Sequence, residues 1–110
     1  MENLNMIGTL YSQVSKRCYI SSDEELIRDR LTNIIKNAVT SVRALIGINS
    51  DDIVDFSIPS QENELLINYC FYRWNNQSQV EFETNYIGDI ISLRIKYEMK
   101  YKRPESIDNG

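Results

Sequence analysis

The longest regular pattern of apolar and polar positions lies between Ser22 and Gly47. Its apolar residues fall in one stripe about 140° wide when each residue advances a helix by 100°. The stripe contains Ile27, Leu31, Ile34, Ile35, Ala38, Val39, Val42, Leu45 and Ile46. Most side chains on the opposite face are charged or amides. The pattern predicts one long amphipathic helix that packs through a single face.

Signals for both ends of this helix are present. The run Ser22-Asp23-Glu24-Glu25 has the form of a capping box, in which Ser22 accepts from the amide of Glu25 and Glu25 accepts in return. Gly47 suits the left-handed position that follows a helix C-terminus.

A shorter repeat near the N-terminus predicts a first helix. Its apolar residues, Leu4, Ile7, Tyr11 and Val14, have the spacing of one helix face. Gly8 lies inside the repeat and lowers its helix propensity.

Residues 47–58 predict a connecting segment, which we expect Ile53, Val54, Phe56 and Ile58 to anchor on the core. Three aspartates in this segment suggest a calcium loop. The spacing lacks the central glycine and the terminal glutamate of the helix-loop-helix calcium site. We therefore expect no metal there.

A further helix is predicted after the connecting segment, with Pro59 in its first turn. Residues 65–74 are apolar nearly all the way round, with Asn68 and Arg73 as exceptions. A helix of this kind is buried on more than one side. It is either the centre of the core or covered by a second protein.

The last predicted helix, Glu81–Tyr101, has two apolar stripes on nearly opposite faces. The first contains Tyr86, Ile90, Leu93, Tyr97 and Tyr101, and the second contains Gly88, Ile91, Ile95 and Met99. One stripe can face the core. The other requires cover, either from a neighbouring subunit, which we favour, or from the first helix of the same chain.

These elements predict an all-α fold, a small bundle of about four helices with a long central amphipathic helix. The chain has 110 residues, of which 42% are hydrophobic, a size that suits one domain with one core. No apolar run approaches a membrane span, and no secretory signal is visible. We expect an intracellular protein in which Cys18 and Cys70 are reduced thiols.

The charge distribution favours a protein partner over nucleic acid. The formal net charge is −4, whereas binding through phosphates requires a basic face. Residues 94–110 nevertheless carry five of the 12 basic side chains and three of the 16 acidic ones. This basic end either complements a helix dipole or forms a docking tail for an acidic or polar surface.

Residues for enzyme chemistry are missing from the sequence. There is no histidine, which removes the commonest general base and nearly all catalytic zinc sites. The cysteines form no CxxC pair, and no glycine-rich phosphate loop occurs. We interpret Glu81 and Glu83 as solvated acids at a helix start, and the many aromatics as core or interface residues. The sequence therefore predicts no catalytic, cofactor-binding or metal-binding residue.

The order of these elements resembles the small head-tail connector, or adaptor, proteins of tailed bacteriophages over roughly residues 4–101. The resemblance is carried by Asp23-Glu24-Glu25-Leu26, the pair Ile58-Pro59, the helix end Tyr72-Arg73-Trp74-Asn75, and Leu93-Arg94 with Tyr97. It implies a helical connector domain at residues 1–103 and a flexible C-terminal tail at residues 104–110. It also implies a homo-oligomeric ring of about twelve subunits beneath the portal.

The same resemblance implies a place in the virion, at the head-tail interface, after assembly in the host cytoplasm. The ring would extend the channel, let DNA pass without sequence-specific binding, and dock a stopper or tail protein. No cofactor and no membrane is implied. In that family the C-terminal helix and tail engage the portal. With the second stripe of the last helix, this gives the expected interface Ile91, Ile95, Met99, Lys100, Tyr101, Lys102 and Arg103.

Two other functions stay open at the level of sequence. The first is a small helical regulatory protein that binds a single phage or host protein. The second is a helical DNA-binding module, which the negative net charge disfavours.

Overall fold

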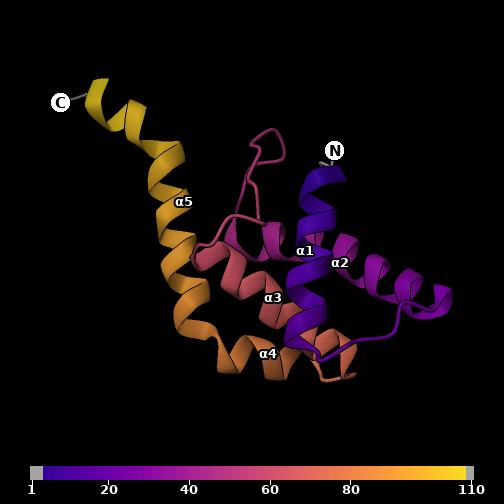
Figure 1. The fold of residues 1–110 in the computed structure, drawn as a ribbon. Helices are drawn as coiled ribbons and strands as arrows, with labels where there is room; N and C mark the ends of the chain where they lie inside the picture. The colour runs from indigo at the N-terminus through magenta and orange to yellow at the C-terminus, as the bar shows by residue number, and fades with distance from the viewer. Residues whose placement is uncertain (1–3, 109–110) are drawn as a thin grey trace.

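The computed structural model describes the backbone of residues 4–108 and the side chains of residues 5–102. This part of the chain forms five helices and no strand (Figure 1). They are α1 (Leu4–Arg17), α2 (Glu25–Ile46), α3 (Gln61–Trp74), α4 (Gln79–Asn85) and α5 (Ile87–Asp108). The predicted all-α fold is confirmed. The helices number five rather than about four because the last predicted helix is divided in two.

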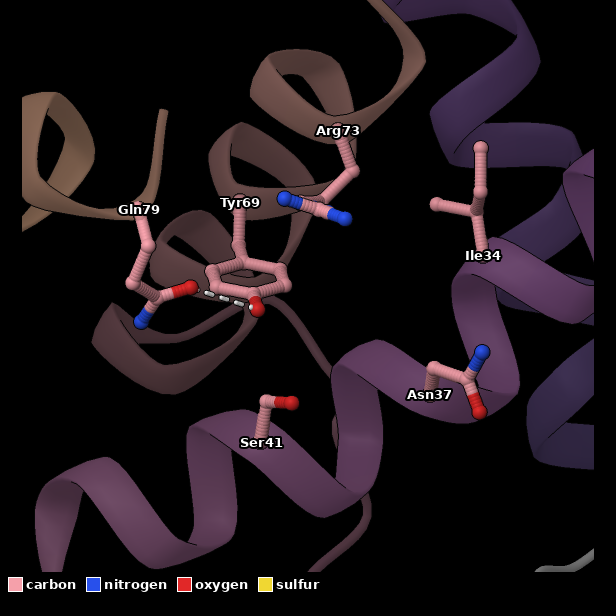
Figure 2. Close-up of a pocket in the computed structure, with 6 residues that line it drawn as sticks. All are labelled: Ile34, Asn37, Ser41, Tyr69, Arg73 and Gln79. Atoms are coloured by element: carbon pink, nitrogen blue, oxygen red, sulfur yellow. Dashed lines mark hydrogen bonds between the residues drawn. The ribbon is translucent and has the colours of Figure 1, made fainter. Parts of the chain in front are cut away.

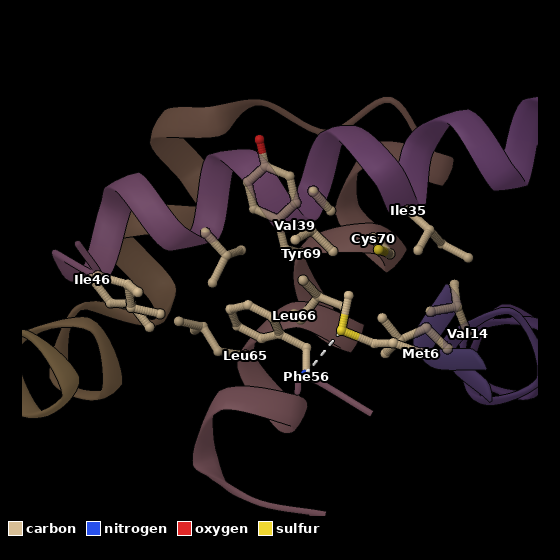
Figure 3. Close-up of a cluster of buried hydrophobic side chains, with 14 of the residues drawn as sticks. Met6, Val14, Ile35, Val39, Ile46, Phe56, Leu65, Leu66, Tyr69 and Cys70 are labelled. Atoms are coloured by element: carbon tan, nitrogen blue, oxygen red, sulfur yellow. Dashed lines mark hydrogen bonds between the residues drawn. The ribbon is translucent and has the colours of Figure 1, made fainter. Parts of the chain in front are cut away.

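Helix α3 is the centre of the bundle, since it packs against each of the other four helices. Its side chains Leu65, Leu66, Tyr69 and Cys70 are buried (Figure 3). The helix with apolar residues nearly all the way round is therefore covered by its own chain. Of the two interpretations, the centre of the core is confirmed.

Helix α2 lies along α3 and buries the predicted stripe, from Leu31 to Ile46. Its C-terminus is confirmed: Gly47 is left-handed, with φ of 79°, and its N–H donates to the carbonyl of Arg43. The capping box is wrong, because Ser22 Oγ accepts from the amide of Glu24 at 3.2 Å. Glu24 is the N-cap, two residues after Ser22, so Ser22 lies outside the position that a capping box requires and forms a local turn instead.

Helix α3 begins at Gln61, two residues later than a helix with Pro59 at its first position. Ser60 is the N-cap, and its hydroxyl accepts from the amide of Asn63 at 3.1 Å. The Ser60 hydroxyl thereby satisfies one of the free N–H groups of the first turn. A proline at the N-cap has no side-chain acceptor and could not do so. The prediction that Pro59 lies in the first turn is therefore wrong.

The connecting segment is anchored mainly by Phe56, whose side chain is fully buried. Its amide donates to Met6 Sδ at 3.4 Å (Figure 3). Its carbonyl accepts from Asn63 Nδ2 at 2.6 Å. Ile53 and Ile58 are exposed, so their prediction as anchors is wrong. The segment projects beyond the helices as a loop, and only part of it returns to the core (Figure 1).

The single helix predicted over Glu81–Tyr101 is wrong, because the chain turns at Tyr86 between α4 and α5. Tyr86 stacks on Phe82 with ring centroids 5.0 Å apart, and both rings pack edge-on against Tyr72 of α3. Asn85 Nδ2 also donates to the Tyr72 hydroxyl at 2.8 Å. The turn places these aromatic side chains against the central helix, which a straight helix would not do.

Helix α1 is followed by a bulky residue, Tyr19, in a backbone conformation that favours glycine. Tyr19 has φ of 58°, and its neighbour Ile20 donates from its amide to the carbonyl of Ser15 at 2.9 Å. This is the hydrogen bond of a helix-terminating Schellman motif, in which the left-handed position is usually Gly. A side chain there costs roughly 1–2 kcal/mol.

Helix α5 continues through most of the segment predicted as a tail, as far as Asp108. Residues 109–110 and the side chains of residues 103–108 lie outside the described part of the chain. The flexibility of residues 104–110 stays a prediction. Among the described residues, no helix is long and apolar enough to cross a membrane.

Candidate protein interface on helix α5

The inner face of α5 is built into the core. Ile90, Leu93 and Tyr97 are each at most 3% exposed, and they share the first of the two predicted stripes. They face α2, α3 and α4, the helices against which α5 packs.

The opposite face of α5 carries four large apolar side chains in a row, which we name the outer stripe: Ile87, Ile91, Ile95 and Met99. Their exposed fractions are 50%, 47%, 50% and 63%. The four-residue spacing places them side by side along the helix. Because α5 makes no packing contact with α1 among the described residues, the alternative that the first helix covers this stripe is wrong.

An uncovered stripe of this kind is a candidate binding surface. A single exposed apolar residue is ordinary, but a contiguous row of four on one helix face is typical of an interface. Removing the remaining exposed area of these side chains from water would stabilise a complex by about 25 cal/mol for each Å² covered.

Charged residues form a second row beside the outer stripe, at Arg94, Glu98 and Lys102. Lys102 Nζ lies 3.3 Å from Glu98 Oε2, and both groups are exposed. Arg94 Nε donates to the carbonyl of Leu45 at 2.7 Å. The guanidinium of Arg94 forms no ion pair with a carboxylate among the described residues. The edge of the stripe therefore has a net positive charge.

Two of the expected interface residues instead contact the connecting segment of their own chain. Lys100 Nζ lies 2.8 Å from Asp52 Oδ2, and the Tyr101 hydroxyl donates to the same oxygen at 2.7 Å. Tyr101 also accepts from the amide of Asn49 at 3.0 Å. The hydrogen bonds from Lys100 and Tyr101 lower the pKa of Asp52 below its ordinary value. Arg103 has its side chain outside the described residues.

Sequence reasoning thus found three members of the outer stripe, Ile91, Ile95 and Met99, and Lys102 in the row beside it. It missed Ile87, although the four-residue spacing back from Ile91 could have identified it. The interface carried over from the resemblance also grouped Lys100 and Tyr101 with the stripe, whereas the structure gives both of them partners in the connecting segment.

A buried carboxylate holds α5 in place on α3. Glu62 is 5% exposed and accepts from Lys96 Nζ and from the Tyr97 hydroxyl, each at 2.6 Å. Burial opposes ionisation of Glu62, but the two hydrogen bonds outweigh it and lower the pKa below its ordinary value. This ion pair therefore fixes the orientation of α5, and with it the direction of the outer stripe.

We expect Glu62→Gln to lower the free energy of unfolding by about 1–3 kcal/mol at pH 7. Because the folded-state pKa is lowered, the stabilisation is fully present above the ordinary glutamate pKa of about 4.3 and is lost as the pH falls through the folded pKa. Urea unfolding of both proteins at pH 7 and at acid pH measures the difference.

The difference between the two proteins should shrink as the pH falls, since other carboxylates such as Asp52 act equally in both. A difference that stays constant down to acid pH would show that Glu62 contributes by packing alone.

A polar pocket of about 250 Å³ lies between α2, α3 and the start of α4 (Figure 2). It is lined by Ile34, Asn37, Ser41, Tyr69, Arg73 and Gln79. The Tyr69 hydroxyl donates to Gln79 Oε1 at 2.9 Å, and Gln79 in turn donates to Glu83. The lining holds the hydroxyl groups of Ser41 and Tyr69 but no thiol, carboxylate or histidine, so it offers these hydroxyls none of the usual general bases.

Other groups with chemical potential lie apart from this pocket. Cys18 and Cys70 are both free thiols, as the sequence predicts. Burial raises the pKa of Cys70 well above its ordinary value, which makes it an unreactive core residue. Within the described residues there is no group of three or more acidic or thiol side chains that could hold a metal ion.

Comparison with known proteins gives no relative for this chain. No protein-family model, no curated protein and no solved structure matches it.

Proposed function

We propose that this protein is a structural subunit of the head-tail connector of a tailed bacteriophage, with an adaptor role beneath the portal. The observation that carries the proposal is the outer stripe, an apolar surface that the described chain leaves uncovered. A subunit that works through contacts requires such a surface, whereas an enzyme requires a reactive cleft.

The arrangement of α5 suits an adaptor. The helix lies along one side of the bundle, and its last turns extend beyond the other helices (Figure 1). A protruding helix with apolar and basic side chains can reach into a neighbouring ring while the rest of the subunit stays outside. The order of helices that resembles the connector family adds to this support.

The charge of the chain agrees with a place beside a DNA channel. The formal net charge of −4 repels phosphates, so DNA would slide past the subunit without being held. A protein that gripped DNA would need a basic face and would bind it in a salt-dependent way.

Native mass spectrometry of the chain with the portal protein of its phage tests this proposal. We expect one defined ring stoichiometry, with the same number of chains on every portal. A failure to assemble with the portal under every salt condition would overturn the proposal. A simple one-to-one complex with another protein, and no ring, would favour a regulatory function instead.

A further inference from the structure

A second exposed surface lies where α1 passes into α2, and we name it the α1–α2 corner: Tyr19, Asp23, Glu24, Glu25, Leu26 and Asp29. Tyr19 is 89% exposed and Leu26 is 81% exposed, more than any residue of the outer stripe. Neither side chain contributes much buried area to the fold, so both are available for contact with a partner.

The backbone at Tyr19 adds a second observation. This residue occupies the left-handed position that ends α1, where glycine is favoured, and its ring gains almost no burial in return. The left-handed conformation serves to end α1, but the fold makes no use of an aromatic ring at this position, which is a reason to look for a function. An aromatic ring presented to solvent at a rigid helix end is the kind of side chain that anchors a protein interface.

The corner is acidic, whereas the edge of the outer stripe is basic. Glu24, Glu25 and Asp29 have no cationic partner among the described residues. Arg28 lies 4.0 Å from Asp23 within the corner, whereas Arg30 lies over the ring of Trp74. The four acidic side chains of the corner therefore outnumber the one arginine that is paired there. On α5, Arg94 has no carboxylate partner. The two surfaces are therefore complementary both in apolar content and in charge.

The outer stripe and the part of the corner that belongs to α2 lie on opposite sides of the molecule. In Figure 1, α5 runs along one side of the bundle, and the first turn of α2 lies at the far end of the other. One chain therefore cannot join its own corner to its own stripe. A contact between different surfaces of two copies leaves one free surface at each end, so it can continue from copy to copy and close into a ring.

We propose that the outer stripe of one copy binds the α1–α2 corner of the next. This inference rests on the proposed function and deepens it, since it names the occupant of the stripe and the surface that occupies it. Tyr19 and Leu26 cover Ile91, Ile95 and Met99, and the acidic groups of the corner face Arg94 and Lys102.

Two variants, each blocked on one surface, test the proposal by sedimentation velocity up to about 1 mM. Ile95→Asp blocks the stripe, and Leu26→Asp blocks the corner. An Asp in the first turn of α2 suits the helix dipole, so the second variant should fold. We expect wild-type chains to associate with increasing concentration, and each variant alone to be monomeric.

A mixture of the two variants gives the decisive result. Each partner keeps one intact surface, so the mixture should form a one-to-one dimer and nothing larger. Association of Leu26→Asp alone, to the same extent as the wild type, would overturn the proposal in favour of stripe-to-stripe pairing. A mixture that stays monomeric would also overturn it.

Tyr19→Gly separates binding from folding. Glycine relieves the left-handed strain, so the monomer should be at least as resistant to urea as the wild type. Association should nevertheless weaken about tenfold or more, as for an interface anchor. The control is Val80→Asp, which alters an exposed apolar residue at the start of α4 and should leave association unchanged. Unchanged association of Tyr19→Gly would contradict the proposal.

The result is independent of the portal experiment. Wild-type chains that stay monomeric up to about 1 mM would overturn the contact proposed here. The connector function would survive that result if the same chains formed a ring on the portal. Association through these two surfaces without any portal complex would instead leave the contact standing and remove the connector function.

Discussion

Replacing Ile95 by Asp is expected to abolish assembly while the subunit stays folded. Ile95 is half exposed in the centre of the outer stripe, so an aspartate there remains hydrated in the isolated chain. In a complex the same carboxylate would be taken out of water, at a cost of several kcal/mol. We expect the dissociation constant to rise by about two orders of magnitude or more, measured by sedimentation velocity or by binding to the portal.

Ile90→Asp is the matched control, because Ile90 lies on the same helix but is 1% exposed. That variant should unfold, since an uncompensated charge in the core can cost most of the stability of a small domain. In urea, Ile95→Asp should unfold within about 0.5 kcal/mol of the wild type. If Ile95→Asp also unfolds, the outer stripe belongs to the core.

Phe56→Ala is expected to give the largest loss of stability among substitutions outside the helices, about 3–5 kcal/mol. The ring is fully buried and is the main anchor of the connecting segment. The truncation leaves a cavity beside Leu66 and Met6, which the surrounding helices can close only in part (Figure 3). Urea unfolding followed by circular dichroism measures the loss.

Ile53→Ala serves as the control in the same segment, because Ile53 is 93% exposed. Its free energy of unfolding should stay within about 0.5 kcal/mol of the wild type. Equal losses for the two variants would mean that the segment contributes as a whole and that Phe56 is not its anchor.

The sequence was sufficient where one residue pattern determined the structure. The apolar stripe from Leu31 to Ile46 predicted α2, because an amphipathic helix buries only one face. Gly47 predicted the C-terminal end of this helix. The two stripes of the last helix were also predicted correctly within α5, since side chains at four-residue spacing must share a face. Tyr86, which was predicted in the first stripe, lies in the turn before α5. The sequence alone left open whether α1 covered the second stripe, a question that only the packing of the helices could decide.

The sequence was insufficient where contacts between distant residues decided the outcome. Asn85 and Gly88 lower the helix propensity near Tyr86, but they do not fix a turn there. The turn follows from contacts of Phe82 and Tyr86 with Tyr72, which lies 10 and 14 residues earlier in the sequence. In the connecting segment, Phe56 and Ile53 look equally apolar. Phe56 contacts Met6 and Asn63, whereas Ile53 is exposed to solvent. No local sequence pattern distinguishes the two residues.

The same limit applied to the candidate interface. Lys100 follows Met99 directly and was grouped with it, yet its partner Asp52 lies 48 positions away on the connecting segment. The sequence did not predict a role for Tyr19, because only the backbone conformation and the exposure of this residue make it unusual.

Oxidation of Met99 by peroxide, in the free chain and in the complex with the portal, tests most directly the claim that the outer stripe is the contact surface. Met99 is 63% exposed and Met6 is 6% exposed, so the two thioethers report the surface and the core of one molecule. We predict rapid oxidation of Met99 in the free chain and strong protection in the complex, with Met6 slow in both. Equal oxidation of Met99 in the two states would contradict the claim.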